Sequence, residues 1–254
     1  LGVGEPDFQT PWPIRTNAIM TIEKGLTAYT SNQGLKELRQ TLSQYIETHY
    51  KVHYLPSEFL ITNGASEAID IALRAILNPK DEVILPEPTF VSYKPLITLA
   101  GGKPILLDTT KNNFIPDPKE IESKITTKTK AIMLCSPNNP TGVIIPKSIL
   151  KEISKLAIKY NLWVLSDEIY SELIYNTTFT SISTLPNMKC RTIVINGFSK
   201  SYAMTGWRIG YLAAPEELIN RAHKIHQYSA MCASTISQNA AITALKTGKP
   251  YINK

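Results

Sequence analysis

The chain has 254 residues, of which 43% are hydrophobic and 19% are charged, and its formal net charge at pH 7 is +6. With 12 glycines and 17 prolines, this composition excludes a disordered chain, a collagen-like chain and a small disulfide-stapled scaffold. The basic excess is mild and the lysines are scattered, so we expect no nucleic-acid partner.

The cysteine pattern and the hydropathy bear on the compartment. The three cysteines, Cys135, Cys190 and Cys232, are far apart and form no CxxC pair, which argues against a disulfide framework or a zinc site and favours a reducing compartment. No apolar run approaches the ~20 residues of a membrane span, and no secretory signal is visible. We therefore predict a cytoplasmic protein with no membrane partner.

Apolar spacing predicts alternating helices and strands in chain order. Leu35, Leu38 and Leu42 recur at helical spacing, which predicts an amphipathic helix over residues 34–49. The pattern then predicts a strand at 59–62, a helix at 65–77, a strand at 83–85 that Pro86 stops, a helix at 89–100, strands at 105–107 and 131–135, a helix at 147–160, strands at 162–165, 193–195 and 209–213, and helices at 216–229 and 234–247.

This order predicts an α/β fold. Short continuous apolar strands separated by helices are typical of a mostly parallel sheet with helices on both faces, in three layers. In such sheets the ligand binds beyond the carboxyl ends of the strands. The residues that follow each strand are therefore the candidates for function.

Gly64, Ala65 and Ser66 follow the first strand and begin a helix. Backbone N–H groups at a helix start are free to bind an anion, and the helix dipole favours it. An ordinary cap by Ser66 is the alternative. No G-x-G-x-x-G and no G-x-x-x-x-G-K-[ST] occurs, which argues against a dinucleotide or nucleoside-triphosphate site and against an NAD-dependent oxidoreductase.

Polar groups also follow two later strands. Asn139 lies between prolines, where turn chemistry competes with a role as a ligand donor. Asp167 follows an apolar strand, and its carboxylate needs a partner because an unpaired charge in a dry site is costly. A cationic ring nitrogen would be one partner; a helix cap or a surface ion pair is the alternative. Tyr170 offers a phenol three residues beyond.

The most specific segment runs from Gly197 to Gly210 and contains Lys200 in a loop of small residues after a strand. A lysine amine is a useful nucleophile only when its pKa is lowered, and an imine with a carbonyl cofactor is one use of it. A surface lysine is the alternative. His223 and His226 lie three residues apart on a predicted helix, but no carboxylate neighbours them in the sequence, so we predict no metal site.

The segment from Gly197 to Gly210 resembles the lysine signature of the class I and II pyridoxal-phosphate-dependent aminotransferases. Four more blocks resemble that family in the same order: Gly4–Phe8, Tyr29 before Gly34, Asn139–Gly142 and Ser166–Tyr170. The likeness is closest to the aspartate-aminotransferase group. Leu165–Leu173 and His226–Gln238 are similar to members that act on N-acetyl-diaminopimelate.

The resemblance implies pyridoxal 5′-phosphate as cofactor, the large domain of the fold-type I transferases, and a role for each matching residue. Lys200 would form an imine with the cofactor and then move a proton between the amino-acid Cα and the cofactor. Asp167 would pair with the pyridine nitrogen, Asn139 and Tyr170 would hydrogen-bond the 3′ oxygen, and Phe90 would stack on the ring.

The phosphate would lie at the helix start of residues 64–66, with Arg208 opposing its charge and Ser199 nearby. Tyr29 would reach the phosphate of a neighbouring subunit, which implies a homodimer. Gly4 would lie near the substrate carboxylate. The implied reaction moves an amino group from an amino acid to a 2-oxo acid, with aspartate, glutamate or a diaminopimelate derivative as donor.

For the domain organisation, we expect an N-terminal segment over residues 1–30 and a cofactor-binding domain over residues 31–254. The resemblance implies a further C-terminal small domain, carrying the arginine for the substrate α-carboxylate, and we expect it to be absent from this sequence. A lyase of the same fold would keep Lys200, Asp167 and Arg208, and a non-catalytic cofactor-binding regulator is a third possibility. These alternatives stay open at the level of sequence.

Overall fold

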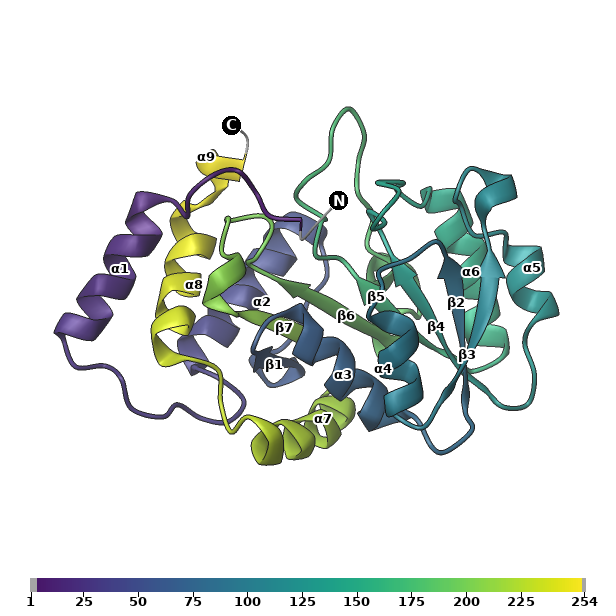
Figure 1. Ribbon diagram of the computed structural model, residues 1–254, viewed down its shortest axis with the longest axis horizontal. Helices are drawn as coiled ribbons and strands as arrows, with labels where there is room; N and C mark the ends of the chain where they lie inside the picture. Colours follow the sequence, from purple (N-terminus) through teal and green to yellow (C-terminus); the bar gives the residue numbers. More distant parts are fainter. Residues whose placement is uncertain (1–3, 253–254) are drawn as a thin grey trace. The chain divides into compact units, whose positions relative to one another are not determined.

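The computed structural model describes residues 4–252, and the chain groups into two compact units. Unit 1 combines the residues up to 68 with those from 196 onward, and unit 2 covers residues 69–195. The strands form a seven-stranded sheet in the order β1-β7-β6-β5-β4-β2-β3 (Figure 1). The pair β1–β7 is antiparallel, whereas β2–β3, β2–β4, β4–β5 and β5–β6 are parallel. The predicted α/β fold with a mostly parallel sheet is confirmed.

Unit 2 holds the parallel strands. These are β2 (Glu82–Glu87), β3 (Lys103–Asp108), β4 (Thr129–Cys135), β5 (Trp163–Asp167) and the first part of β6 (Thr192–Gly197). Its helices are most of α3 (Ala65–Ile76), α4 (Tyr93–Leu99), α5 (Pro118–Ser123) and α6 (Lys147–Lys159), with 3-10 turns at Thr110–Asn112, Ile182–Thr184 and Lys189–Arg191.

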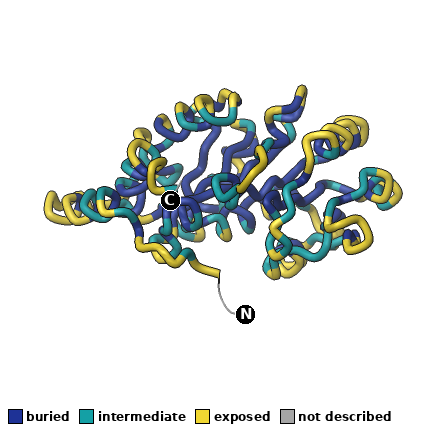
Figure 2. The backbone as a smooth tube through the Cα atoms, turned by 90° about the horizontal axis from the view of Figure 1, so that it is seen from above, coloured by how far each residue is buried: buried dark blue, intermediate teal, exposed yellow. Residues whose placement is uncertain are grey.

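Side-chain alternation gives the sheet of unit 2 two covered faces. On one face, Ile132 and Val164 belong to the same buried cluster as Ile153 of α6. Asp167 lies three residues after Val164 along β5, so its side chain points to the opposite face. The hydroxyl of Tyr93 in α4 donates a hydrogen bond to Asp167, so α4 lies on that face. Figure 2 shows the strands buried and the outer turns of the helices exposed. Helices thus cover both faces of this sheet, as predicted.

Unit 1 contains the antiparallel pair. Strands β1 (Phe59–Thr62) and β7 (Gly210–Ala213) pair so that Thr62 lies opposite Gly210. Around them are the helices α1 (Trp12–Glu23), α2 (Lys36–Tyr50), the start of α3, α7 (Glu216–Ser229), α8 (Thr235–Thr247) and α9 (Lys249–Ile252), with 3-10 turns at Pro56–Glu58 and Thr205–Trp207. Thr62 and Gly210 therefore bring the end of β1 and the start of α3 close to the loop that follows β6.

Two predicted boundaries around prolines differ from the structure. Strand β2 does not stop at Pro86 but runs on to Glu87. Its pairing with β4 extends only to Ile84, so the missing N–H of Pro86 removes no hydrogen bond on that side. The helix expected over 89–100 begins at Tyr93, which places Pro95 in its first turn. The N–H groups of a first turn have no intrahelical acceptor, so the missing N–H of Pro95 removes no helical hydrogen bond.

Three helices have no counterpart in the prediction: α1, α5 and α9. In α1 the apolar side chains do not form one stripe, since Ile14 is buried whereas Ile19, Met20 and Ile22 are exposed. The helices α5 and α9 are too short for their periodicity to be read from sequence. Among the described residues, no helix is both long enough and apolar enough to span a bilayer.

Gly210 marks a close approach of backbones in unit 1. A Cβ atom built at this position would lie 2.6 Å from the nitrogen of Ala65 and 2.6 Å from the carbonyl carbon of Gly64. Only a glycine allows β7 to pass this close to the start of α3.

We expect Gly210→Ala to lower the free energy of unfolding by about 1–3 kcal/mol or more, because main-chain atoms cannot move aside as a flexible side chain can. Denaturant unfolding measures it. Gly206→Ala is the control, since a Cβ at Gly206 meets nothing within 4 Å. Equal effects of the two substitutions would contradict the steric argument.

Candidate functional site

A buried carboxylate lies at the carboxyl end of β5 in unit 2. Asp167 is the last residue of the strand, and the parallel register places it beside Cys135 of β4 and Ile195 of β6. Its Oδ2 accepts a hydrogen bond from the hydroxyl of Tyr93 at 2.5 Å, and its Oδ1 accepts one from the N–H of Ile169 at 3.1 Å. Burial raises the pKa of Asp167 to about 6, although both hydrogen bonds favour the ionised form.

Tyr93 is a site residue that the sequence analysis missed. It is buried at the start of α4, and its ring packs edge-on against Phe90 with the centroids 5.6 Å apart. Burial, together with the charge of Asp167, raises the pKa of Tyr93 well above its ordinary value, so its hydroxyl stays a donor. The three-residue spacing of Phe90 and Tyr93 indicates that their rings lie on the same side of a helical turn. The sequence gives no sign that Tyr93 contacts Asp167, which is 74 residues further along the chain.

Asn139 and Tyr170 form a second polar pair in unit 2. The Nδ2 of Asn139 donates to the Tyr170 hydroxyl across 3.3 Å. Tyr170 is half-buried, and burial, with the charges of Cys135 and Asp167, raises its pKa. The structure therefore brings the predicted residues Asn139 and Tyr170 together near the carboxylate of Asp167.

Unit 1 holds Lys200, the lysine of the predicted site. Lys200 follows β6, and its Nζ donates to the carbonyl oxygen of Gly4 at 2.5 Å. Burial lowers the pKa of Lys200; the charge of Glu5 opposes this shift and the charge of Arg208 adds to it. Ser199 beside it is buried. A lowered pKa increases the share of the amine that is neutral and nucleophilic.

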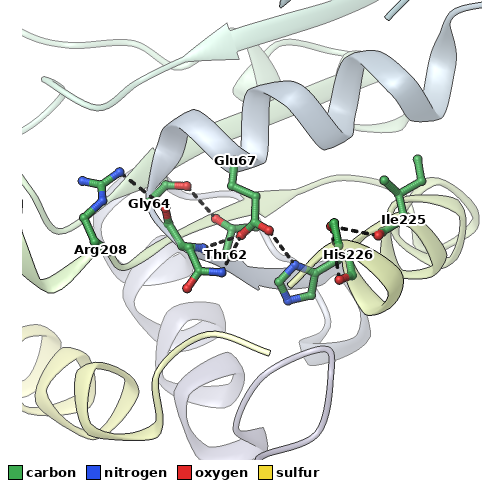
Figure 3. Close-up of polar contacts among 8 residues, drawn as sticks. Thr62, Gly64, Glu67, Arg208, Ile225 and His226 are labelled. Atoms are coloured by element: carbon green, nitrogen blue, oxygen red, sulfur yellow. Dashed lines mark hydrogen bonds and ion pairs between the residues drawn. The ribbon is translucent and has the colours of Figure 1, made fainter. Parts of the chain in front are cut away.

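Arg208 lies against the turn that begins α3 in unit 1. Its guanidinium donates to the carbonyl oxygens of Thr205 at 3.0 Å and of Asn63 at 3.4 Å. Gly64 has a φ of +85°, and a Cβ there would lie 2.5 Å from Nη2 of Arg208. Figure 3 shows Arg208 beside Gly64 at this end of the helix. A fixed cation therefore lies next to the free N–H groups of the first turn of α3, which suits an anion.

Ala65 and Ser66 supply those first-turn N–H groups. The helix begins at Ala65, so Ser66 is its second residue and not the residue that precedes it. The side chain of Ser66 is exposed, while Gly64 is buried. This arrangement fits the anion-binding interpretation of residues 64–66 better than a simple cap.

Tyr29 has 80% of its surface exposed, but the chain on either side of it is fixed. The hydroxyl of Thr235 donates to the carbonyl oxygen of Ala28 at 2.7 Å, and Nε2 of Gln238 donates to the hydroxyl of Thr30 at 3.0 Å. The backbone thus presents the Tyr29 ring outward from a segment tied to α8.

His226, one of the two histidines that the sequence places on one helix, has a carboxylate partner from another helix. Glu67 of α3 reaches His226, whose Nδ1 lies 3.1 Å from Glu67 Oε1. The sequence showed no carboxylate near these histidines, because Glu67 is 159 residues away along the chain. Within residues 4–252 there is no group of three or more His, Cys, Asp or Glu side chains that could hold a metal ion.

Comparison with known proteins identifies the family. The sequence profile described as aminotransferase class I and II matches residues 1–253. The chain belongs to this family. Its members depend on pyridoxal phosphate.

Individual relatives support the assignment. The chain is 47% identical, over 98% of its length, to the Bacillus subtilis protein named "Probable N-acetyl-LL-diaminopimelate aminotransferase". It is 42% identical, over 99% of its length, to the aspartate aminotransferase of Thermotoga maritima, and it spans 67% of that relative. It spans 63% of the Bacillus subtilis protein, so the curated relatives are longer than this chain.

Solved structures agree in fold. The crystal structure of the aspartate aminotransferase from Thermotoga maritima matches with a TM-score of 0.96 at 42% identity, over 99% of this chain and 67% of that one. The aromatic aminotransferase from Pyrococcus horikoshii OT3 matches with a TM-score of 0.95 at 41% identity, over 98% of this chain and 68% of that one. The fold of the family is therefore the fold of this chain.

Glu168 of unit 2 is a second buried acid, next to Asp167 in the chain. Its Oε1 accepts hydrogen bonds from the hydroxyls of Ser166 at 2.8 Å and Ser181 at 2.6 Å. Burial raises the pKa of Glu168 to about 7, although these hydrogen bonds oppose the shift. A carboxyl that binds its proton more tightly in the folded state makes the protein more stable as the pH falls from about 7 towards 4.5.

We expect Glu168→Gln to be more stable than the wild type at pH 8, by about 3 kcal/mol at most, and this difference to shrink as the pH falls to 5. Thermal or urea unfolding across this range measures it. The charge of Asp167 adds to the raised pKa of Glu168, so the difference between the two proteins reports on Glu168 together with this interaction. A difference that does not change with pH would contradict the assignment.

Proposed function

We propose that this chain is the cofactor-binding part of a pyridoxal-phosphate-dependent aminotransferase that moves an amino group from an amino acid to a 2-oxo acid. The observation that carries the proposal is the amine of Lys200. It follows β6, its pKa is lowered by burial and by Arg208, and it stands in the segment that resembles the lysine signature of the family. The profile match over residues 1–253 supports the same conclusion.

The residues of unit 2 fit the ring of this cofactor. Asp167 is a buried carboxylate with two hydrogen-bond donors but no cation among those donors, so a protonated ring nitrogen would complete its charge balance. Asn139 and Tyr170 would donate to the 3′ oxygen of the ring, and Phe90 offers an aromatic face for stacking. Tyr93 holds the carboxylate of Asp167 in place.

The residues of unit 1 fit the phosphate and the reacting amine. Gly64, Ala65 and Ser66 would bind phosphate oxygens through main-chain N–H groups, and Arg208 would balance the negative charge. We assign Ser199 to the same phosphate side. Lys200 would bind the cofactor aldehyde through its Nζ.

The reaction needs a base at the amino-acid Cα. When bound, the cofactor supplies an aldehyde to receive the amino group and a ring that withdraws electrons from Cα. The Nζ of Lys200, with its lowered pKa, would take the proton from Cα and return it on the cofactor side. Asp167 would keep the ring nitrogen protonated. We assign Gly4, whose carbonyl accepts a hydrogen bond from Lys200, to the side of the substrate carboxylate.

The substrate class rests on the names of relatives. Two of these names are aspartate aminotransferase and N-acetyl-LL-diaminopimelate aminotransferase. We propose aspartate, glutamate or an N-acetyl-diaminopimelate compound as the amino donor, within amino-acid biosynthesis. The free cysteines of the described chain are consistent with a cytoplasmic enzyme.

Lys200→Ala tests the central assignment. We expect the wild type, mixed with pyridoxal phosphate, to develop a lysine-dependent visible absorption band that one amino acid removes and its 2-oxo acid restores. The variant lacks the amine and should show neither change while unfolding at a similar temperature. Absorption spectra with amino acids added one at a time measure this.

Lys224→Ala is the matched control, because Lys224 is exposed on α7. If Lys200→Ala keeps the wild-type band, the proposed function is wrong. A band that no amino acid alters would instead favour a cofactor-binding regulator.

We further propose a homodimer in which Tyr29 bonds the cofactor phosphate of the neighbouring subunit. The support is the exposure of Tyr29 between two residues, Ala28 and Thr30, that each hydrogen-bond a side chain of α8. An exposed phenol on a segment that is held in place is suited to a contact outside its own chain.

We expect Tyr29→Phe to raise the Kd for pyridoxal phosphate about tenfold or more, since one hydrogen bond to a charged group is lost. Tyr228→Phe, an equally exposed tyrosine at 86%, should leave the Kd unchanged. Cofactor titration measures the Kd, and light scattering measures the oligomeric state. A monomer that binds the cofactor with the full wild-type affinity would rule out the subunit contact.

A further inference from the structure

The hydrogen bond between Glu67 and His226 is a feature of unit 1 that the proposed reaction does not use. His226 is fully buried on α7, and its Nδ1 lies 3.1 Å from Oε1 of Glu67. A carboxylate oxygen can only accept, so Nδ1 must carry a hydrogen and donate it. The buried histidine therefore fixes the direction in which the Glu67 side chain points.

The other oxygen of Glu67 holds the residue before Gly64. Oε2 of Glu67 accepts from the main-chain N–H of Asn63 at 2.5 Å and from its side-chain Nδ2 at 3.0 Å. Burial by itself raises the pKa of Glu67, but the hydrogen bonds from His226 and Asn63 outweigh it and the pKa is lowered. Glu67 is thus an ionised carboxylate that clamps both polar groups of Asn63.

Asn63 connects this carboxylate to the anion-binding turn. Its carbonyl oxygen accepts from Nη2 of Arg208, and the next residue is Gly64 with its positive φ. The hydroxyl of Thr62 donates to the carbonyl of Gly64 at 2.9 Å. The main chain of Asn63 is therefore held on both sides: its N–H donates to Glu67, and its C=O accepts from Arg208.

The direction of the Glu67 carboxylate matters for an anion bound at the start of α3. A carboxylate in the first turn of α3 would repel a bound phosphate if it pointed toward the free N–H groups. Figure 3 shows Arg208 and His226 on opposite sides of the segment from Thr62 to Glu67, with the Glu67 carboxylate directed to His226. The histidine thus draws the negative charge away from the side on which Arg208 lies.

We propose that Glu67 and His226 are positioning residues for the cofactor phosphate: they hold the Asn63 peptide so that the start of α3 and Arg208 form a ready-made anion site. This proposal rests on the proposed function, since it concerns the phosphate end of the same cofactor. Neither residue touches the reacting atoms.

The test compares pyridoxal phosphate with pyridoxal, which has the same aldehyde and ring but no phosphate. The full chain is titrated with each compound, and the Kd is measured from the lysine-dependent absorption band. We expect Glu67→Ala to raise the Kd for pyridoxal phosphate about tenfold or more and to change the Kd for pyridoxal less than twofold. Inorganic phosphate should also compete less well with pyridoxal phosphate in the variant.

The histidine is tested by replacement and rescue. His226→Ala removes the donor to Glu67 and should weaken pyridoxal phosphate binding selectively, whereas His226→Asn keeps an N–H donor near the Nδ1 position and should restore most of the affinity. Glu67→Gln is the milder variant if Glu67→Ala does not fold. Its side-chain NH₂ group must face one of the two donors, Asn63 or His226, so at least one hydrogen bond is lost. We therefore expect a smaller selective loss of affinity for pyridoxal phosphate.

Glu58→Ala is the matched control, because Glu58 is buried and its carboxylate likewise accepts a main-chain N–H, that of Leu55 at 2.7 Å. It should lower stability without changing the ratio of the two Kd values. Equal weakening of pyridoxal and pyridoxal phosphate by the Glu67 and His226 variants would overturn the inference. That result would leave the proposed function intact, because the proposed function is tested by the lysine-dependent band and by its response to amino acids.

Discussion

The burial of the Asp167 charge is the constraint on which the chemistry of unit 2 depends. A carboxylate at the end of an inner parallel strand has no water to solvate it, and burial alone pushes its pKa to about 6. The hydroxyl of Tyr93 and the N–H of Ile169 donate hydrogen bonds to Asp167, and both favour the ionised form. A cationic ring would favour that form further, so the same burial that is unfavourable for the isolated protein becomes favourable when a positively charged partner is bound.

In unit 1 the electrostatics have the opposite sign, because positive charge lies at the start of α3. Positive groups gather at the start of α3, where the helix dipole, free N–H groups and Arg208 act together. The lowered pKa of Lys200 is partly a result of this gathering, because the charge of Arg208 disfavours a second cation nearby. One arginine can thus serve two purposes: it can balance an anion, and its charge adds to the effect of burial in lowering the pKa of Lys200. Gly64 and Gly210 make this possible, since any side chain at either position would collide with Arg208 or with the main chain of the turn.

Much of the fold and of the site could be predicted from the sequence. Parallel strands rich in apolar residues, such as Ile132–Cys135, and strongly amphipathic helices such as α6 and α7 have periodicities that survive in any globular context. Lys200, Asp167 and Asn139 stand out because each follows or ends such a strand. The pairing of Tyr93 with Asp167 could not be predicted, since the two residues are 74 positions apart and a tyrosine in an apolar helix is ordinary core material. The helix α1 also escaped, because its apolar side chains are not confined to one face.

The sequence by itself determined the class of the fold, the family, and the chemical types present: an amine, an arginine, a carboxylate, an amide and a phenol. These follow from local patterns and from blocks of residues that stand in a fixed order. Only the tertiary structure decided the surroundings of each group. It lowered the pKa of Lys200, raised that of Asp167, and turned His226 from a possible metal ligand into the partner of Glu67. The reason is that burial, dielectric environment and charge contacts are set by residues far apart in the chain, whereas the sequence displays only neighbours.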